Sequence, residues 1–321
     1  MKKFLTILAA SSALAAYAPS AMAANIAVVG GSNDDAFWNL IKKGLDDARP
    51  GVEANGGKIN YLRLVNYDNF APDVVGLIRT AISQKVDGLV IPDWVPESED
   101  PAIKDAMKAG IKVILMNAGG GDKAKELGAI NYVGSDEYVA GKAGGENFAA
   151  KGSKHVICIN TLPGTANIEA RCKGVIEGIT GKGGKAEQLP LPSSSFGNAT
   201  AVAEAIKATL LKDPSIDGAI TISAGDADSA AIGIGQANAG AKVKLGSFDL
   251  NKAGLARIKA GAQAFAIDQQ PYLQAYLASS LLASAIDFGT SLPTFPVLTG
   301  PGIVDSSNID ATLAGVAKGA R

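Results

Sequence analysis

Two polar residues end corresponding segments of an internal repeat, and both can hydrogen-bond a polar ligand. In the first copy, an apolar run begins after Asp87-Gly88, and a later apolar run, IKVILM, ends on the amide Asn117. In the second copy, the first run begins after Asp217-Gly218, and the later run, VKLGSF, ends on the carboxylate Asp249. Open parallel sheets bind ligands at the carboxyl ends of their strands. The repeat therefore predicts two facing lobes with a polar cleft between them.

The segments that would position these side chains alternate between strand and helix. Each copy of the repeat has a short apolar run, a longer segment with a 3.6-residue apolar period, and another short run. Such alternation is typical of a parallel sheet covered by helices. The sequence predicts an α/β protein with two similar three-layer, parallel-sheet (Rossmann-like) lobes. In the first lobe we expect strands at 25–31, 58–65, 88–91, 111–116 and 130–136, and helices at 37–54, 73–83 and 101–109.

The chain is expected to cross between the lobes more than once. A short strand runs into Ser135-Asp136 before a Gly-rich helix, which predicts one crossing near 134–137. A second is expected at Gln269-Gln270-Pro271, where a strand ends and Pro begins a helix. The Pro- and Gly-rich tail would supply a third, giving a multi-strand hinge. We assign 24–134 plus 269–296 to the N-terminal lobe and 135–268 plus 297–321 to the C-terminal lobe.

The composition favours a folded two-domain protein with a small or neutral partner. The chain has 321 residues, of which 47% are hydrophobic and 19% charged, enough for two cores of ordinary size. Its 30 basic and 31 acidic residues give a formal net charge of -1. No basic surface for nucleic acid or for a membrane is therefore expected.

Residues 1–23 resemble a signal peptide. Lys2 and Lys3 precede the apolar stretch Phe4–Ala16, and Ala21-Met22-Ala23 forms a small-residue cleavage site. The alternative is a retained membrane anchor, but the apolar stretch falls short of the ~20 residues that a membrane-spanning helix needs. We expect cleavage near Ala23 and an exported, soluble mature protein.

The chain has two cysteines and one histidine. In an oxidising compartment, Cys158 on a strand and Cys172 on the following helix are disulfide candidates, the alternative being two buried thiols. The single histidine, His155, cannot supply a multi-histidine metal site or a histidine-based hydrolase alone. Accordingly, we expect no metal and no cofactor.

One segment carries a specific resemblance. Pro163–Arg171, PGTANIEAR, resembles the Pro-Gly, four variable residues, Glu-Ala-Arg segment of glucose and galactose receptors. The mature chain as a whole is similar to the ribose and galactose type of periplasmic binding protein, the substrate-binding subunit of an ABC importer. The resemblance implies that Arg171 holds sugar hydroxyls with its rigid fork of donors. Asn167 replaces an acidic ligand residue of that segment.

The same resemblance implies further ligand-binding residues and partners. Asp35-Ala36-Phe37-Trp38 is similar to the segment whose rings clamp the sugar, because aromatic faces pack on its C–H groups. Ala118 stands where the ribose receptor has Arg. The implied partners are a small neutral sugar or polyol and an inner-membrane ABC permease, with no nucleic acid and a monomeric state. The implied binding residues are Asp35, Phe37, Trp38, Asp93, Asn117, Asn167, Arg171, Phe196, Asp226, Asp249 and Gln269.

Two functions from different classes follow. The first is capture of a monosaccharide or sugar alcohol, with a pentose, deoxy sugar or polyol favoured because the first-lobe Arg is missing. The alternative is an exported carbohydrate-active enzyme that uses cleft carboxylates among Asp93, Asp226 and Asp249. A chemotaxis role is compatible with the same residues.

Overall fold

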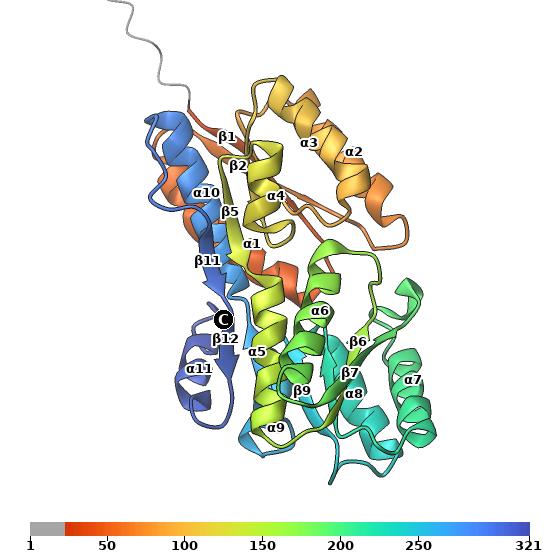
Figure 1. Ribbon diagram of the computed structural model, residues 1–321. Helices are drawn as coiled ribbons and strands as arrows, with labels where there is room; N and C mark the ends of the chain where they lie inside the picture. The colour runs from red at the N-terminus through yellow and green to blue at the C-terminus, as the bar shows by residue number, and fades with distance from the viewer. Residues whose placement is uncertain (1–22) are drawn as a thin grey trace, which may run out of the picture.

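The computed structural model describes residues 23–321 and contains two six-stranded sheets (Figure 1). The expected leader, apart from Ala23, lies outside the described residues. All neighbours in the first sheet are parallel, including β11 on β5, so the sheet is covered by crossover helices. Its order is β11 (Val297–Gly300), β5 (Asn131–Ser135), β4 (Lys112–Met116), β3 (Gly88–Ile91), β1 (Asn25–Gly30), β2 (Lys58–Arg63).

The second sheet repeats this order. Its strands run β12 (Gly302–Val304), β10 (Phe265–Asp268), β9 (Lys244–Phe248), β8 (Gly218–Thr221), β6 (His155–Asn160), β7 (Lys185–Pro190). Only β12 is antiparallel to its neighbour. In both sheets the chain order reverses beside the first strand, which makes a topological switch point. The predicted α/β class and the two similar parallel-sheet lobes are confirmed.

Helices cover both faces of each sheet. In the first lobe, α1 (Ala36–Glu53) and α10 (Pro271–Asp287) lie on one face, and α2, α3 and α4 lie on the other (Figure 1). The remaining bounds are α2 (Phe70–Ser83), α3 (Pro96–Lys108), α4 (Gly120–Leu127), α5 (Glu137–Ala150), α6 (Ala166–Thr180), α7 (Ala199–Lys212), α8 (Ala224–Gln236), α9 (Lys252–Lys259), α11 (Ile309–Val316) and the short 3₁₀ turn η1 (Ser193–Ser195).

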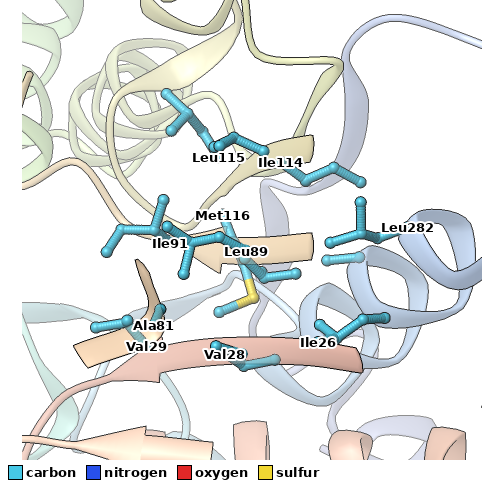
Figure 2. Packing of buried hydrophobic residues seen from close by; sticks show 14 of the residues in the cluster. Ile26, Val28, Val29, Ala81, Leu89, Ile91, Ile114, Leu115, Met116 and Leu282 are labelled. Atoms are coloured by element: carbon cyan, nitrogen blue, oxygen red, sulfur yellow. The ribbon is translucent and has the colours of Figure 1, made fainter. Parts of the chain in front are cut away.

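The strands form the core because their side chains are apolar on both faces. Every residue of β3 is buried, as expected for a central parallel strand. Figure 2 shows Val28, Leu89 and Met116 from three neighbouring strands in one cluster with Leu282 of α10. The sheet is therefore a rigid platform for the loops that follow its strands.

Three segments connect the lobes, at β5–α5, β10–α10 and β11–β12. The third differs from the sequence assignment in one respect. β11 pairs with β5 of the first sheet, so residues 297–300 belong to that sheet and not to the C-terminal lobe. The chain reaches the second sheet only at β12. The expected break at Pro296 is therefore too early, because the tail supplies one strand to each sheet.

Other differences are local. The helix expected at 101–109 begins at Pro96, and the helix expected at 73–83 begins at Phe70. Helix α4 was not predicted. It is a short helix whose N-cap, Gly119, and first residue, Gly120, are glycines with positive φ, so its start has the composition of a loop.

Cys158 in β6 and Cys172 in α6 form a disulfide with a Cα–Cα distance of 5.5 Å. His155 lies at the opposite end of β6 from the interlobe cleft, and its ring nitrogens lie 2.8 Å from Ser215 Oγ and 3.1 Å from Glu187 Oε1. Across residues 23–321, none of the helices has both the length and the hydropathy required of a transmembrane span.

Candidate functional site

A cavity of about 70 Å³ lies between the lobes, at the carboxyl ends of the strands of both sheets. This is the location that the strand order predicts for a ligand. The loops after β1, β3, β4, β6, β8, β9 and β10 all reach it. Nine of the eleven predicted binding residues line it: Asp35, Phe37, Trp38, Asn117, Asn167, Arg171, Phe196, Asp249 and Gln269.

Asn117 and Asp249 occupy equivalent places, each directly after a strand. Both have a left-handed backbone, with φ of 68° and 64°. Asn and Asp are the side chains most often found in this conformation. The Nδ2 of Asn117 donates to Gln269 Oε1 over 3.4 Å, and Gln269 Nε2 donates to Asp249 Oδ1. A chain of polar groups therefore runs from one lobe to the other through the crossing segment.

Arg171 is almost fully buried, and its orientation is fixed by two other groups. Its Nε donates to Glu137 Oε2 over 2.7 Å, and Nη2 donates to Glu137 Oε1 over 3.1 Å. Its Nη1 donates to the carbonyl of Ile222 over 2.8 Å. The ring of Phe248 packs against the guanidinium at 4.4 Å. Sequence reasoning missed Glu137, which does not itself line the cavity.

Asn167, the fourth residue before Arg171, offers an unused acceptor. Its side chain is buried and lines the cavity, and its Oδ1 has no hydrogen-bond partner among residues 23–321. Buried polar atoms are nearly always paired. This oxygen therefore indicates a ligand or water that donates from within the cavity.

Aromatic rings form a continuous series along the cavity. The centroids of successive rings lie 5.1 to 5.6 Å apart, in edge-on or tilted contacts that aromatic rings prefer. The series runs Phe37, Trp38, Trp94, Phe70, Tyr67, Phe196. Tyr67 and Phe70 were missed. Their signal was two rings within a polar loop just past a strand.

The two lobes touch across the cavity. Tyr67 of the first lobe meets Phe196 of the second, with ring centroids 5.2 Å apart. The backbone N–H of Ala166 donates to the carbonyl of Trp94 over 2.8 Å. The second contact connects the loop after β3 directly to the start of α6. The structure thus has a closed cleft.

Two carboxyl groups that line the cavity, and Glu137 beside Arg171, have raised pKa values. Burial raises the pKa of Asp249 to about 7, although the nearby Arg171 and the Gln269 amide oppose the rise. Burial also raises the pKa of Asp35, which caps α1 and accepts a hydrogen bond from Tyr67 over 2.8 Å. Burial raises the pKa of Glu137, and Arg171 counteracts it through the two-bond contact.

Asp226 lies in a second, larger cavity of about 640 Å³ that adjoins the first and shares Phe37, Tyr67 and Asp249 with it. Thr161 Oγ1 donates to Asp226 Oδ2 over 2.8 Å, and burial raises the pKa of Asp226 to about 6. This carboxylate therefore lies beside the inner cavity and not in its lining.

The structure does not bring Asp93 to the cavity. Its side chain is fully buried and lies against Gly119, whereas its neighbour Trp94 lines the cavity. Asp93 lies instead near the charged groups of Asp100 and Lys123. Asp93 therefore does not line the cavity as expected, whereas Trp94 does. The other missed lining residues are Leu162, Thr165, Ile168, Ile222 and Ser223.

The sequence model of the family described as periplasmic binding protein domain matches residues 26–291. The chain belongs to this family. A carbohydrate transporter from Acidothermus cellulolyticus 11B, solved in complex with myo-inositol, is 34% identical, with a TM-score of 0.83. That alignment covers 93% of this chain and 99% of the transporter.

Two further proteins are similar to this chain. The xylose/arabinose-binding protein XylF of Sulfolobus acidocaldarius is 27% identical over 255 residues, 75% of this chain. The chain spans only 62% of the length of that curated relative. The glucose-galactose binding protein GanP of Geobacillus stearothermophilus shares the fold, with 22% identity, a TM-score of 0.78, and coverage of 89% and 98% of the two chains.

Proposed function

We propose that this protein is a periplasmic solute-binding protein that captures a monosaccharide or sugar alcohol and delivers it to an ABC-transporter permease. The proposal includes removal of residues 1–23 as a signal peptide and a monomeric mature chain. The relatives support the class of ligand, since their names include myo-inositol, xylose, arabinose, glucose and galactose.

The observation that carries the proposal is the combination of groups around one closed cavity. Arg171 supplies donors, Asp249 supplies acceptors, and Asn167 has a buried oxygen without a partner in the described chain. Rings from both lobes flank these groups. A sugar or cyclitol has hydroxyls on its rim and C–H groups on its faces, which matches this arrangement. We propose that the nine predicted residues lining the cavity, together with Trp94, contact the ligand.

The alternative, a carbohydrate-active enzyme, needs two carboxyl groups on either side of one glycosidic bond. Of its three candidates, Asp93 lines neither cavity, and Asp226 and Asp249 share only the larger, adjoining cavity. No specific observation favours it over the binding protein.

Thermal unfolding of residues 24–321 against a panel of neutral ligands tests the proposal. The panel contains myo-inositol, D-xylose, L-arabinose, D-glucose and D-galactose, after removal of any carried-over ligand by unfolding and refolding. A ligand at 100 times its dissociation constant should stabilise by about 2.7 kcal/mol, which raises Tm by a few degrees. Selective stabilisation by one or two members supports the proposal. No shift with any member, or release of product from a glycoside, would overturn it.

A further inference from the structure

The contact between Glu137 and Arg171 is built by close packing of two helices. Glu137 is the first residue of α5, directly after the crossing strand β5, and Arg171 lies in α6. A Cβ added at Gly141 would lie 2.0 Å from the carbonyl oxygen of Arg171, and one at Gly174 would lie 2.2 Å from that of Tyr138. Only glycine allows the backbones to approach so closely. This approach brings the Glu137 carboxylate within reach of the guanidinium.

The pairing consumes most of the hydrogen-bonding capacity of Arg171. A guanidinium has five N–H donors. Two of them bond the two oxygens of Glu137, and one bonds the Ile222 carbonyl. One N–H on each terminal nitrogen is left for a ligand. The side chains of Glu137 and Arg171 are 6% and 3% exposed, so the pair is shielded from water.

The pairing also balances the charge of Arg171, so the guanidinium brings no uncompensated positive charge to the cavity. Among the described residues that line the cavity, Arg171 is the only lysine or arginine, and the acidic ones are Asp35 and Asp249. Because Glu137 balances Arg171, the remaining formal charge comes from those two carboxyl groups. An anionic ligand would meet oriented donors without a compensating charge. An uncharged hydroxyl would accept hydrogen bonds from the same donors without leaving a buried, uncompensated negative charge.

We propose that Glu137 determines the ligand class of the site: by orienting and neutralising Arg171 from behind, it makes the cavity accept uncharged sugars and polyols and reject sugar acids. Glu137 is a positioning residue, since it lies outside the cavity lining and acts through Arg171. This inference rests on the proposed function, because it specifies which carbohydrates the same cavity takes.

The test compares matched neutral and acidic ligands with the full mature chain. The pairs are D-glucose with D-glucuronate, D-galactose with D-galacturonate, and L-arabinose with L-arabinonate, measured by titration calorimetry at constant ionic strength. For the pair whose neutral member binds wild type, we expect the acid to bind at least about 100-fold more weakly. In Glu137→Gln the affinity for the neutral member should fall by about 10-fold. The ratio of the affinities for the neutral and the acidic member should shrink by about 10-fold or more.

Two variants separate charge from structure. Glu137→Asp keeps the charge but shortens the side chain. It should therefore weaken binding of the neutral ligand and retain the discrimination against the acid. It also carries the test if Glu137→Gln does not fold. Glu177 lies in α6, the helix of Arg171, and makes an exposed pair with Lys142 of α5, so Glu177→Gln removes one negative charge and should change neither property.

The inference is overturned if wild type binds the acid as tightly as the neutral sugar. It is also overturned if Glu137→Gln weakens both members equally, if Glu137→Asp loses the discrimination, or if Glu177→Gln narrows it to the same extent. None of these results contradicts the proposed function, because each leaves binding of a neutral sugar to the wild type in place. The absence of binding by any neutral member to wild type would instead overturn the proposed function.

Discussion

Single residues of this site depend on backbone conformation as much as on chemical type. Asn117 and Asp249 leave their strands with positive φ, and this turn directs both side chains toward the same amide, Gln269. The positions are equivalent in the two lobes, but the residues differ. The first lobe presents an amide that donates and accepts, and the second presents a carboxyl group that is an acceptor only when ionised.

The first prediction concerns Asp249. Burial in the closed cleft raises its pKa to about 7, and ligand hydroxyls that donate to it favour the ionised form. Binding is then coupled to proton release, so affinity should rise with pH up to about 7 and level off above it. The decline below pH 7 should approach about tenfold per pH unit.

Titration calorimetry from pH 5 to 8.5 measures this profile. Asp249→Asn should bind about 10-fold more weakly at pH 8 and show a nearly flat profile. Asp105→Asn, which alters an exposed pair on α3, is the control and should keep the wild-type profile. An unchanged profile in Asp249→Asn would assign the titration to another carboxyl group, and the prediction would be wrong.

The types of residue near strand ends were predictable from the sequence, whereas the directions of their side chains were not. The resemblance and the strand ends identified Arg171, Asn117 and Asp249. Asp93 and Trp94 follow the same strand, and the sequence gives no direction for either side chain; the Trp94 ring lines the cavity and the Asp93 carboxylate does not. Glu137 left no sequence signal, because its role depends on the packing of two helices.

At the scale of elements, the tight contact of α5 with α6 positions the binding guanidinium. The second prediction tests this contact. Gly141→Ala would place a Cβ 2.0 Å from the Arg171 carbonyl oxygen, so the helices must separate. We expect a loss of about 1–3 kcal/mol in the free energy of unfolding, together with weaker ligand binding.

Urea unfolding and calorimetry measure both effects of Gly141→Ala. The control is Gly235→Ala in α8, an exposed helical position where an added Cβ meets nothing within 4 Å. That change should be neutral or stabilising by up to about 1 kcal/mol, with unchanged affinity. Equal effects of the two substitutions would contradict a role for helix approach.

The third prediction concerns the disulfide that ties α6 to β6. Cys158 and Cys172 are 14 residues apart and almost fully buried. Closing a loop of this length restricts the unfolded chain and stabilises by about 3 kcal/mol. The double variant Cys158→Ala, Cys172→Ala should lose roughly this amount in urea unfolding, and reduction of the wild type should reproduce the loss. Identical stability with and without the bridge would contradict the prediction.

Most elements were predictable because parallel strands and amphipathic helices have distinct apolar periods. The expected strands agree with the observed ones to within about two residues at each end, a typical uncertainty for boundaries. Helix α4 was missed because its N-cap and first residue are glycines. Strand β11 was assigned to the wrong sheet because the two consecutive strands of the tail, β11 and β12, belong to different sheets. Strand pairing depends on distant partners, which local patterns do not contain.

At the scale of the whole molecule, closure buries charge. The repeat in the sequence predicted two lobes and a polar cleft, but not how far the lobes close. In the closed structure Asp226 and Asp249 lie within the interlobe region, and Asp93 and Glu99 lie buried behind the loop of Trp94. The loop depends on this arrangement, because the Trp94 N–H donates to Glu99 Oε2 over 2.8 Å.

The last prediction follows from these four groups together. Burial raises the pKa of Asp226 to about 6, of Asp93 and Asp249 to about 7, and of Glu99 to about 8, from ordinary values of 3.8 and 4.5. Between the ordinary and raised values, the unfolded chain has released protons that the folded chain retains. The free energy of unfolding therefore falls as pH rises from about 4 to about 8.

Calorimetry of the unliganded protein should give a Tm at pH 8 that is about 5 °C or more below that at pH 5.5. Glu99→Gln removes the group with the highest of these pKa values while keeping an acceptor for the Trp94 N–H, so its Tm should change less between the two pH values. Glu177→Gln, an exposed glutamate, serves as the control and should keep the wild-type difference. A Tm that is constant or higher at pH 8 would show that these carboxyl groups ionise without cost in the folded protein, and the prediction would be wrong.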